Sequence, residues 1–148
     1  MREMAGYGLA AGYLILCSLE DIRKKSVPVF LLLFGMAGGV AFRGMLFLMG
    51  DSSLGEMLAC LIPGALLWLF AVVSREIGDG DGIAWIGIGG FLGGAVYAVL
   101  LVSLILAFFW SAGILIRKAG GRKYRIPFLP FSLAGLVLWL AVYILETR

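Results

Sequence analysis

Long apolar runs recur along almost the whole chain and constrain its fold more than any other feature. Six such segments can be drawn, at residues 4–20, 28–49, 55–73, 82–93, 95–116 and 128–145. A helix satisfies its backbone hydrogen bonds internally in lipid and needs roughly 20 residues to cross a bilayer. Charged residues make up only 14% of the chain, against about a quarter in a soluble domain. We therefore predict one all-α domain over residues 1–148, a polytopic membrane protein with six transmembrane helices.

Positive charge is concentrated on one set of the connections between these segments. The connections after the first, third and fifth segments carry Arg23, Lys24, Lys25, Arg75, Arg117, Lys118, Arg122, Lys123 and Arg125. The opposite set holds only Arg2, Arg43 and Arg148. By the positive-inside rule, the odd-numbered connections are cytoplasmic and both termini lie outside the plasma membrane. The net charge of +3 thus indicates membrane orientation, with contact to anionic lipid headgroups as an alternative role, and not binding to nucleic acid.

This orientation is expected to put two acidic residues at one membrane depth. Asp21 ends the first apolar segment and Asp81 begins the fourth, so both should lie at the cytoplasmic ends of their helices. With one helix fewer between them, they would face opposite sides of the membrane. An acid at the centre of a membrane helix costs about 2.5–3.5 kcal/mol, so an acid in or beside such a helix is a functional hypothesis by default.

The second acid belongs to a glycine-rich stretch, Ile77-Gly78-Asp79-Gly80-Asp81-Gly82. Glycines let one backbone approach another closely and adopt φ values that other residues avoid. We expect a tight turn or a short extended segment that a substrate peptide could approach. The same composition would also suit a flexible loop between two helices.

The side chains present leave carboxylates as the candidate catalytic groups. The chain has no histidine, which removes Ser-His-Asp and Cys-His catalysis and histidine-based zinc sites. Two carboxyl groups a few ångströms apart share one proton, so one can take a proton from water while the other polarises a carbonyl. Asp21 and Asp81 could do this, although Asp21 could also be a solvated acid near Arg23 and Asp81 a helix cap.

Several other residues are expected to have structural roles. Glycines at G-x-x-x-G spacing, which favours close helix packing, occur as the pairs Gly8/Gly12, Gly35/Gly39 and Gly90/Gly94. Cys17 and Cys60 lie inside apolar runs without a C-x-x-C pairing and are expected to be small core residues. Arg43, near the outer end of the second segment, is expected to extend toward that interface, near Asp51 or Glu56.

Three motifs resemble those of the type IV prepilin peptidases. Leu19-Glu20-Asp21-Ile22-Arg23, followed by Val27-Pro28, is similar to the first catalytic motif, an Asp-x-Arg and then a hydrophobic-Pro pair. Gly78-Asp79-Gly80-Asp81 matches the G-x-G-D of the second. Ile126-Pro127-Phe128-Leu129-Pro130-Phe131 resembles the segment that opens the last helix of that family. Together, in this order, the motifs are specific, whereas G-x-G-D alone would be weak.

The resemblance implies an aspartic endopeptidase that cuts short basic leader peptides from prepilin or pseudopilin chains. Cleavage would occur just after a glycine, at the cytoplasmic membrane face, with Asp21 and Asp81 as the catalytic pair and without metal or cofactor. Gly78 and Gly80 would shape the substrate-binding segment. Larger members also methylate the new terminus with an N-terminal region of paired C-x-x-C motifs. No such region precedes Asp21 here, so we expect peptidase activity without methyltransferase activity.

The charge pattern adds a hypothesis about substrate binding. Because the leader is basic, the acids that flank the catalytic pair, Glu20, Glu76 and Asp79, would receive it. Two positions depart from the family pattern. Ile83 stands where a lysine is common, and Val29 stands where Asn or Asp is common. These departures leave the choice of substrate open, and the sequence also leaves open whether the chain forms a homo-oligomer.

Two further interpretations remain open. The acids could form a cation site in a small membrane transporter or channel component. The chain could also be an inactive homologue that binds pilins without cutting them. A membrane phosphatidyltransferase is excluded, because its D-G-x-x-A-R pattern is absent after Asp81. The presenilin-type proteases share G-x-G-D, but their Tyr-Asp and Pro-Ala-Leu motifs are absent.

Overall fold

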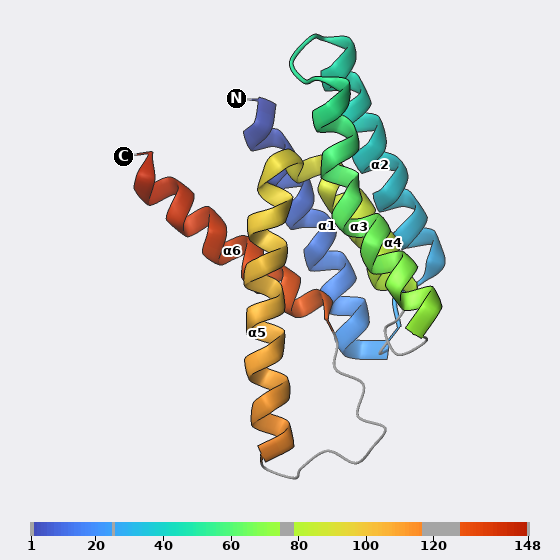
Figure 1. Ribbon diagram of the computed structural model, residues 1–148, viewed down its shortest axis with the longest axis vertical. Helices are drawn as coiled ribbons and strands as arrows, with labels where there is room; N and C mark the ends of the chain where they lie inside the picture. Colours follow the sequence, from blue (N-terminus) through green and yellow to red (C-terminus); the bar gives the residue numbers. More distant parts are fainter. Residues whose placement is uncertain (1, 25, 75–78, 117–127, 148) are drawn as a thin grey trace.

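The computed structural model describes residues 2–24, 26–74, 79–116 and 128–147, and this described part is helical, without a β-strand (Figure 1). It forms six α-helices and one short 3₁₀ turn: α1 (Arg2–Lys24), α2 (Val29–Leu48), α3 (Leu54–Ser74), α4 (Asp79–Leu92), η1 (Gly93–Ala95), α5 (Val96–Ile116) and α6 (Leu129–Glu146). The all-α prediction is confirmed, and each predicted segment corresponds to one helix.

Four stretches of the described chain are long and apolar enough to cross a membrane: Val29–Leu48, Leu54–Val73, Gly80–Gly113 and Leu129–Glu146. The 34-residue stretch Gly80–Gly113 contains both α4 and α5, which run in opposite directions on either side of η1 (Figure 1). The protein is therefore a multi-pass membrane protein by length and composition. Six spans with outside termini remain a prediction.

The short helix α4 is enclosed by α1, α2 and α3, and its glycines make that close packing possible. A Cβ atom added at Gly82 would lie 2.6 Å from Cβ of Trp68, and one added at Gly64 would lie 2.7 Å from Cα of Ile86. Further along, a Cβ at Gly89 would meet the backbone of Cys60. Contacts later in α4 are made with residues earlier in α3, so the two helices are antiparallel. Their backbones nearly touch.

Helix α2 packs against the other side of α4, in the parallel direction. A Cβ added at Gly87 would lie 2.6 Å from the carbonyl oxygen of Gly35, and one added at Gly90 would lie 2.8 Å from Cα of Gly39. The packing role predicted for the Gly35/Gly39 pair is thus confirmed. Of the Gly8/Gly12 and Gly90/Gly94 pairs only Gly90 packs in this way, because a Cβ at Gly8, Gly12 or Gly94 would meet no atom of the described residues within 4 Å.

A compact turn joins α2 to α3. Gly50 adopts a φ of 77°, which glycine tolerates without strain, and its N–H donates to the carbonyl of Phe47. The N–H of Asp51 donates to Leu46, which completes a Schellman motif at the end of α2. Ser53 and Glu56 then form a capping box, since each side chain accepts a hydrogen bond from the backbone N–H of the other, at 3.1 and 2.9 Å.

Arg43 does not extend to the outer interface beside Asp51 or Glu56, so that expectation was wrong. Its side chain is buried, only 9% exposed, and its Nε donates to the carbonyl of Gly90 at 3.3 Å. That carbonyl belongs to the last turn of α4, where partial negative charge favours a cation. Gly93 follows with a φ of 59°, and a Cβ there would lie 2.7 Å from the guanidinium carbon of Arg43. Arg43 therefore caps α4 from a neighbouring helix.

A proline inside α3 connects that helix to α5. Pro63 has no N–H, so it cannot donate to the carbonyl of Ala59 four residues earlier. The hydroxyl of Tyr97, in the first turn of α5, donates to this carbonyl at 2.6 Å. In lipid an unpaired backbone carbonyl is costly, so Tyr97 compensates for the proline.

Helix α6 packs between α1 and α5. On one side, Tyr7 contacts the rings of Trp139 and Tyr143, with centroid separations of 5.0 and 5.9 Å. On the other, a Cβ added at Gly135 would lie 3.0 Å from the carbonyl oxygen of Val99. Cys17 and Cys60 are buried, free thiols, as the sequence predicted.

Candidate active site

The ends of α1 and α4 that carry the predicted catalytic acids lie at the same end of the bundle. The two helices are antiparallel: a Cβ at Gly6, near the start of α1, would meet the carbonyl of Phe91, near the end of α4. Asp21 lies about 22 Å from this contact toward the end of α1, and Asp81 lies about 15 Å from it toward the start of α4, at 1.5 Å per residue. Because the helices are antiparallel, both displacements point toward the same end of the bundle. In Figure 1 the last turns of α1 (blue) lie toward the lower end of the bundle.

Asp21 occupies the inward face of α1. It is 9% exposed, and the core residues Leu14 and Cys17 precede it at intervals that keep all three on one side of the helix. Arg23 and Lys24, which follow, are exposed. The burial of Asp21 argues against a freely solvated acid, because a carboxylate in such surroundings loses hydration.

Asp81 is the third residue of α4 and is partly buried. The glycines on either side press against neighbouring helices: a Cβ at Gly80 would lie 2.9 Å from Leu32 of α2, and Gly82 abuts Trp68 of α3. Gly80 and Gly82 are helical, so the turn or extended segment expected here does not occur within the described residues. Their contribution is close packing, which holds the first turn of α4 between α2 and α3.

The position of Asp81 also affects its electrostatics. The first turn of a helix presents unpaired N–H groups and partial positive charge, which favours a carboxylate. Asp79 is the first residue of α4. The predicted site residues Glu76 and Gly78 lie outside the described residues.

Glu20 is next to Asp21 but belongs to another face of α1. Its carboxylate forms an ion pair with Lys24 at 2.8 Å, one helical turn away. Pairs at this spacing stabilise a helix by about 0.2–0.5 kcal/mol. Since the pair is partly exposed, it can exchange for another cation at small cost.

Two buried polar groups, one helical turn deeper in the bundle than the acids, were not predicted from the sequence. Ser18 is 3% exposed and Trp85 is fully buried, and neither the Ser18 hydroxyl nor the Trp85 indole N–H has a hydrogen-bond partner among the described residues. Trp85 packs against Phe128 at a ring separation of 6.3 Å, just before α6. Their spacing from the acids, three residues for Ser18 and four for Trp85, was the available signal.

The described residues contain no group of three or more His, Cys, Asp or Glu side chains able to hold a metal ion. The arrangement that they do contain is a membrane-embedded helical bundle with one carboxylate at the end of α1 and another at the start of α4. This defines a class: a multi-pass membrane protein with two carboxylates, from different helices, at one end of the bundle.

Comparison with known protein families identifies the family within this class. Residues 8–116 match the type IV leader peptidase family, from the first half of α1 to the end of α5. Because the match covers most of the chain, the protein belongs to this family and is a peptidase by family. The segment Ile126–Phe131 lies beyond the matched residues. No curated protein and no solved structure matched the chain.

Proposed function

We propose that the protein is an aspartic endopeptidase of the plasma membrane that removes short basic leaders from prepilin-like chains, with Asp21 and Asp81 as the catalytic pair. The observation that carries the proposal is the placement of Asp21 and Asp81 at one end of the bundle, on antiparallel helices, in a chain of the type IV leader peptidase family. The positive-inside pattern supports a cytoplasmic position for that end.

The chemistry needs only the two carboxyl groups and a water molecule. The ionised carboxyl takes a proton from water as the water oxygen attacks the carbonyl carbon of the scissile bond. The protonated carboxyl gives its proton to the carbonyl oxygen, which yields a neutral tetrahedral diol. The first carboxyl then gives its proton to the leaving nitrogen as the C–N bond breaks, while the second carboxyl, now ionised, takes a proton from one hydroxyl of the diol; the new carboxyl group forms and the pair returns to its starting protonation.

The surrounding helices would hold the two carboxyl groups in position and would take no direct part in the reaction. Gly80 and Gly82 let the first turn of α4 sit against α2 and α3, so Asp81 is on a rigid element. Glu20, Glu76 and Asp79 would attract the basic leader to this end, in part by exchange of Lys24 for a leader cation on Glu20. Methylation of the new terminus is not part of the proposed activity.

The proposal is tested with purified protein and a chain that carries a short basic leader, a glycine at the cut site and an apolar helix. We expect a shortened product in the presence of a strong chelator at the same rate as in its absence. Cleavage that requires a divalent cation would contradict the proposal and favour a cation site. Failure to cut several different leaders would favour a homologue that binds pilins without cutting them.

A further inference from the structure

Three serines are buried in the described helices, and Ser18 differs from the other two. The Ser103 hydroxyl donates to the carbonyl of Val99 at 2.6 Å. The Ser132 hydroxyl likewise donates to the carbonyl of Phe128 at 3.3 Å. Such bonds to the carbonyl four residues earlier are common for a serine inside a helix. Ser18 is 3% exposed, yet its hydroxyl has no hydrogen-bond partner among the described residues, so its own helix does not use it.

A second unused donor lies in α4. Trp85 is fully buried, and its indole N–H has no acceptor in the described part of the chain. An indole N–H donates and cannot accept. A buried donor without an acceptor costs free energy, because it has given up its hydrogen bonds to water and the neighbouring lipid offers none. Two such donors in one small bundle call for a common explanation.

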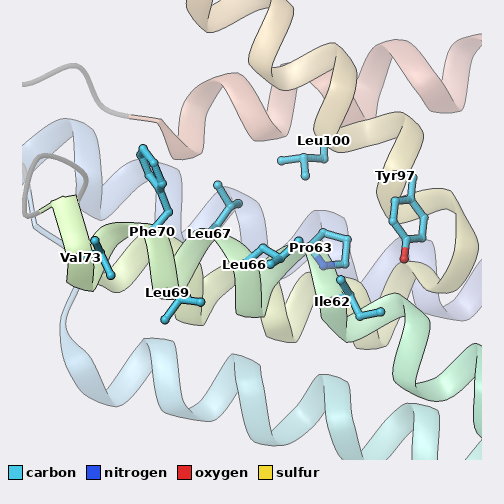
Figure 2. Close-up of a pocket in the computed structure, with 9 residues that line it drawn as sticks. All are labelled: Ile62, Pro63, Leu66, Leu67, Leu69, Phe70, Val73, Tyr97 and Leu100. Atoms are coloured by element: carbon cyan, nitrogen blue, oxygen red, sulfur yellow. The ribbon is translucent and has the colours of Figure 1, made fainter.

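Neither donor is placed to contact a substrate directly. An apolar groove of about 640 Å³ lies between α3 and α5, and the side chains that line it come from those two helices alone (Figure 2). Ser18 and Trp85 belong to α1 and α4, and the bundle encloses both. Their partners are therefore expected within the protein.

Each donor lies one helical turn deeper than one of the proposed catalytic acids, on the same helix. Ser18 precedes Asp21 by three residues on α1, about 4.5 Å along the axis at 1.5 Å per residue. Trp85 follows Asp81 by four residues on α4, about 6 Å along the axis. Residues at these spacings are neighbours on a helix surface. Because the two helices are antiparallel, both donors lie on the same side of the acids, toward the middle of the bundle.

The directions of the side chains bring each donor and its acid together. Side chains in a helix lean toward its N-terminus. On α1, the Asp21 carboxyl group therefore leans over the turn that holds Ser18, and it interacts electrostatically with the thiol of Cys17 in that turn. On α4, the Trp85 indole leans toward the turn that holds Asp81. Carboxyl oxygens accept hydrogen bonds, so the two donors complement the two acids.

We propose that Ser18 and Trp85 are positioning residues for the catalytic pair. The Ser18 hydroxyl donates toward the Asp21 carboxyl group through one buried water. The Trp85 N–H donates toward that of Asp81 in the same way. A buried water needs two or more polar partners, and each donor with its acid supplies them. The inference rests on the proposed function, because fixing one oxygen of each acid from beneath holds the other within about 0.5 Å of the geometry that the reaction needs.

The test removes each donor with little change in the shape of its side chain, and it uses the leader-bearing chain of the cleavage assay. Ser18→Ala deletes the hydroxyl. Replacement of Trp85 by benzothienylalanine puts sulfur in the place of the indole N–H, in a ring of nearly the same size. Ser103→Ala is the matched control for the first, since Ser103 is fully buried and its hydroxyl is bonded within α5. The same replacement at Trp139, a partly buried residue that packs on Tyr7, is the control for the second.

We expect Ser18→Ala and the Trp85 replacement each to lower kcat about tenfold with KM retained, which corresponds to about 1.4 kcal/mol of the activation barrier. Ser18→Thr keeps a hydroxyl and should retain most of the wild-type kcat, and both controls should match the wild type. Donor variants with the kcat of the controls would overturn the inference while the proposed function stands. A raised KM at constant kcat would assign the donors to substrate binding and would also overturn it. A wild type that cuts no leader would overturn both.

The indole N–H signals in nuclear magnetic resonance give a second readout, independent of turnover. The chain has four tryptophans, so isotopic labelling of the indole nitrogen gives four signals, and Trp85→Phe identifies that of Trp85. We expect Asp81→Asn to shift the Trp85 signal, because an amide replaces the carboxylate that anchors the bridging water. The Trp139 signal should not move. A Trp85 signal that Asp81→Asn leaves unchanged would overturn the inference even in a protein that cuts leaders.

Discussion

The glycine contacts of α2 with α4 give a quantitative prediction, which the Gly39→Ala variant tests. The new Cβ would lie 2.8 Å from the carbonyl carbon and 2.9 Å from Cα of Gly87. Ordinary contact between carbon atoms is about 3.5–4.0 Å, so the helices must separate by about 1 Å. Both atoms belong to the backbone of α4, so no side-chain rotation can relieve the clash.

Overpacking of this kind costs about 1–3 kcal/mol, and the better helix propensity of alanine returns at most about 1 kcal/mol. We therefore expect Gly39→Ala to lower the free energy of unfolding by about 1–2 kcal/mol. For a chain of this size, that is a fall in Tm of roughly 2–8 °C. The measurement is thermal unfolding in detergent, followed by the far-ultraviolet circular dichroism of the helices.

Gly12→Ala is the matched control. Gly12 belongs to a G-x-x-x-G pair in α1, but a Cβ there meets no atom within 4 Å in the part of the chain that the structure describes. Its Tm should be unchanged or slightly higher. Equal destabilisation by the two variants would refute the argument, because it would show that glycine itself, and not the space around Gly39, determines the cost.

Two other contacts give predictions of the same kind. Tyr97→Phe should lower the free energy of unfolding by about 1–2 kcal/mol, because the Ala59 carbonyl loses its donor. In a Pro63→Ala background the residue 63 N–H can supply that bond, so the Tyr97→Phe effect should shrink toward zero in a double-mutant cycle; an unchanged effect would contradict the compensation. Arg43→Met keeps the apolar stem but removes the charged hydrogen bond to Gly90, and should cost about 1.5–3 kcal/mol in thermal unfolding. A Met variant as stable as the wild type would show that the cap contributes nothing.

The sequence predicted the helices well because hydropathy reports directly on them. The fourth segment, expected at 82–93, is observed as Asp79–Leu92, and the end at Gly93 coincides with a positive φ. The position of Asp81 in the first turn of a helix also followed from the run of apolar residues after it. The glycine-rich composition did not distinguish a turn from a helix pressed against its neighbours.

Contacts between distant helices were less predictable. Gly35/Gly39 and Gly8/Gly12 have identical spacing, and only the tertiary arrangement determines that the first pair faces α4. Arg43 was assigned to the interface because its partner carbonyl, Gly90, is 47 residues away in a helix whose end was uncertain. The bond from Tyr97 to Ala59 had a signal, since a proline within a membrane segment leaves a carbonyl that some donor must satisfy.

The most direct test of the central claim is co-expression of the protein with a prepilin that carries a basic leader, read by the size of the pilin. Wild type is compared with Asp21→Asn, Asp81→Asn and, as the matched control, Asp79→Asn. These substitutions remove the charge with little change in volume. The proposed pair predicts that the first two variants leave the pilin full length while Asp79→Asn still shortens it. Shortening by Asp81→Asn but not by Asp79→Asn would contradict the assignment and make Asp79 the catalytic carboxylate of α4.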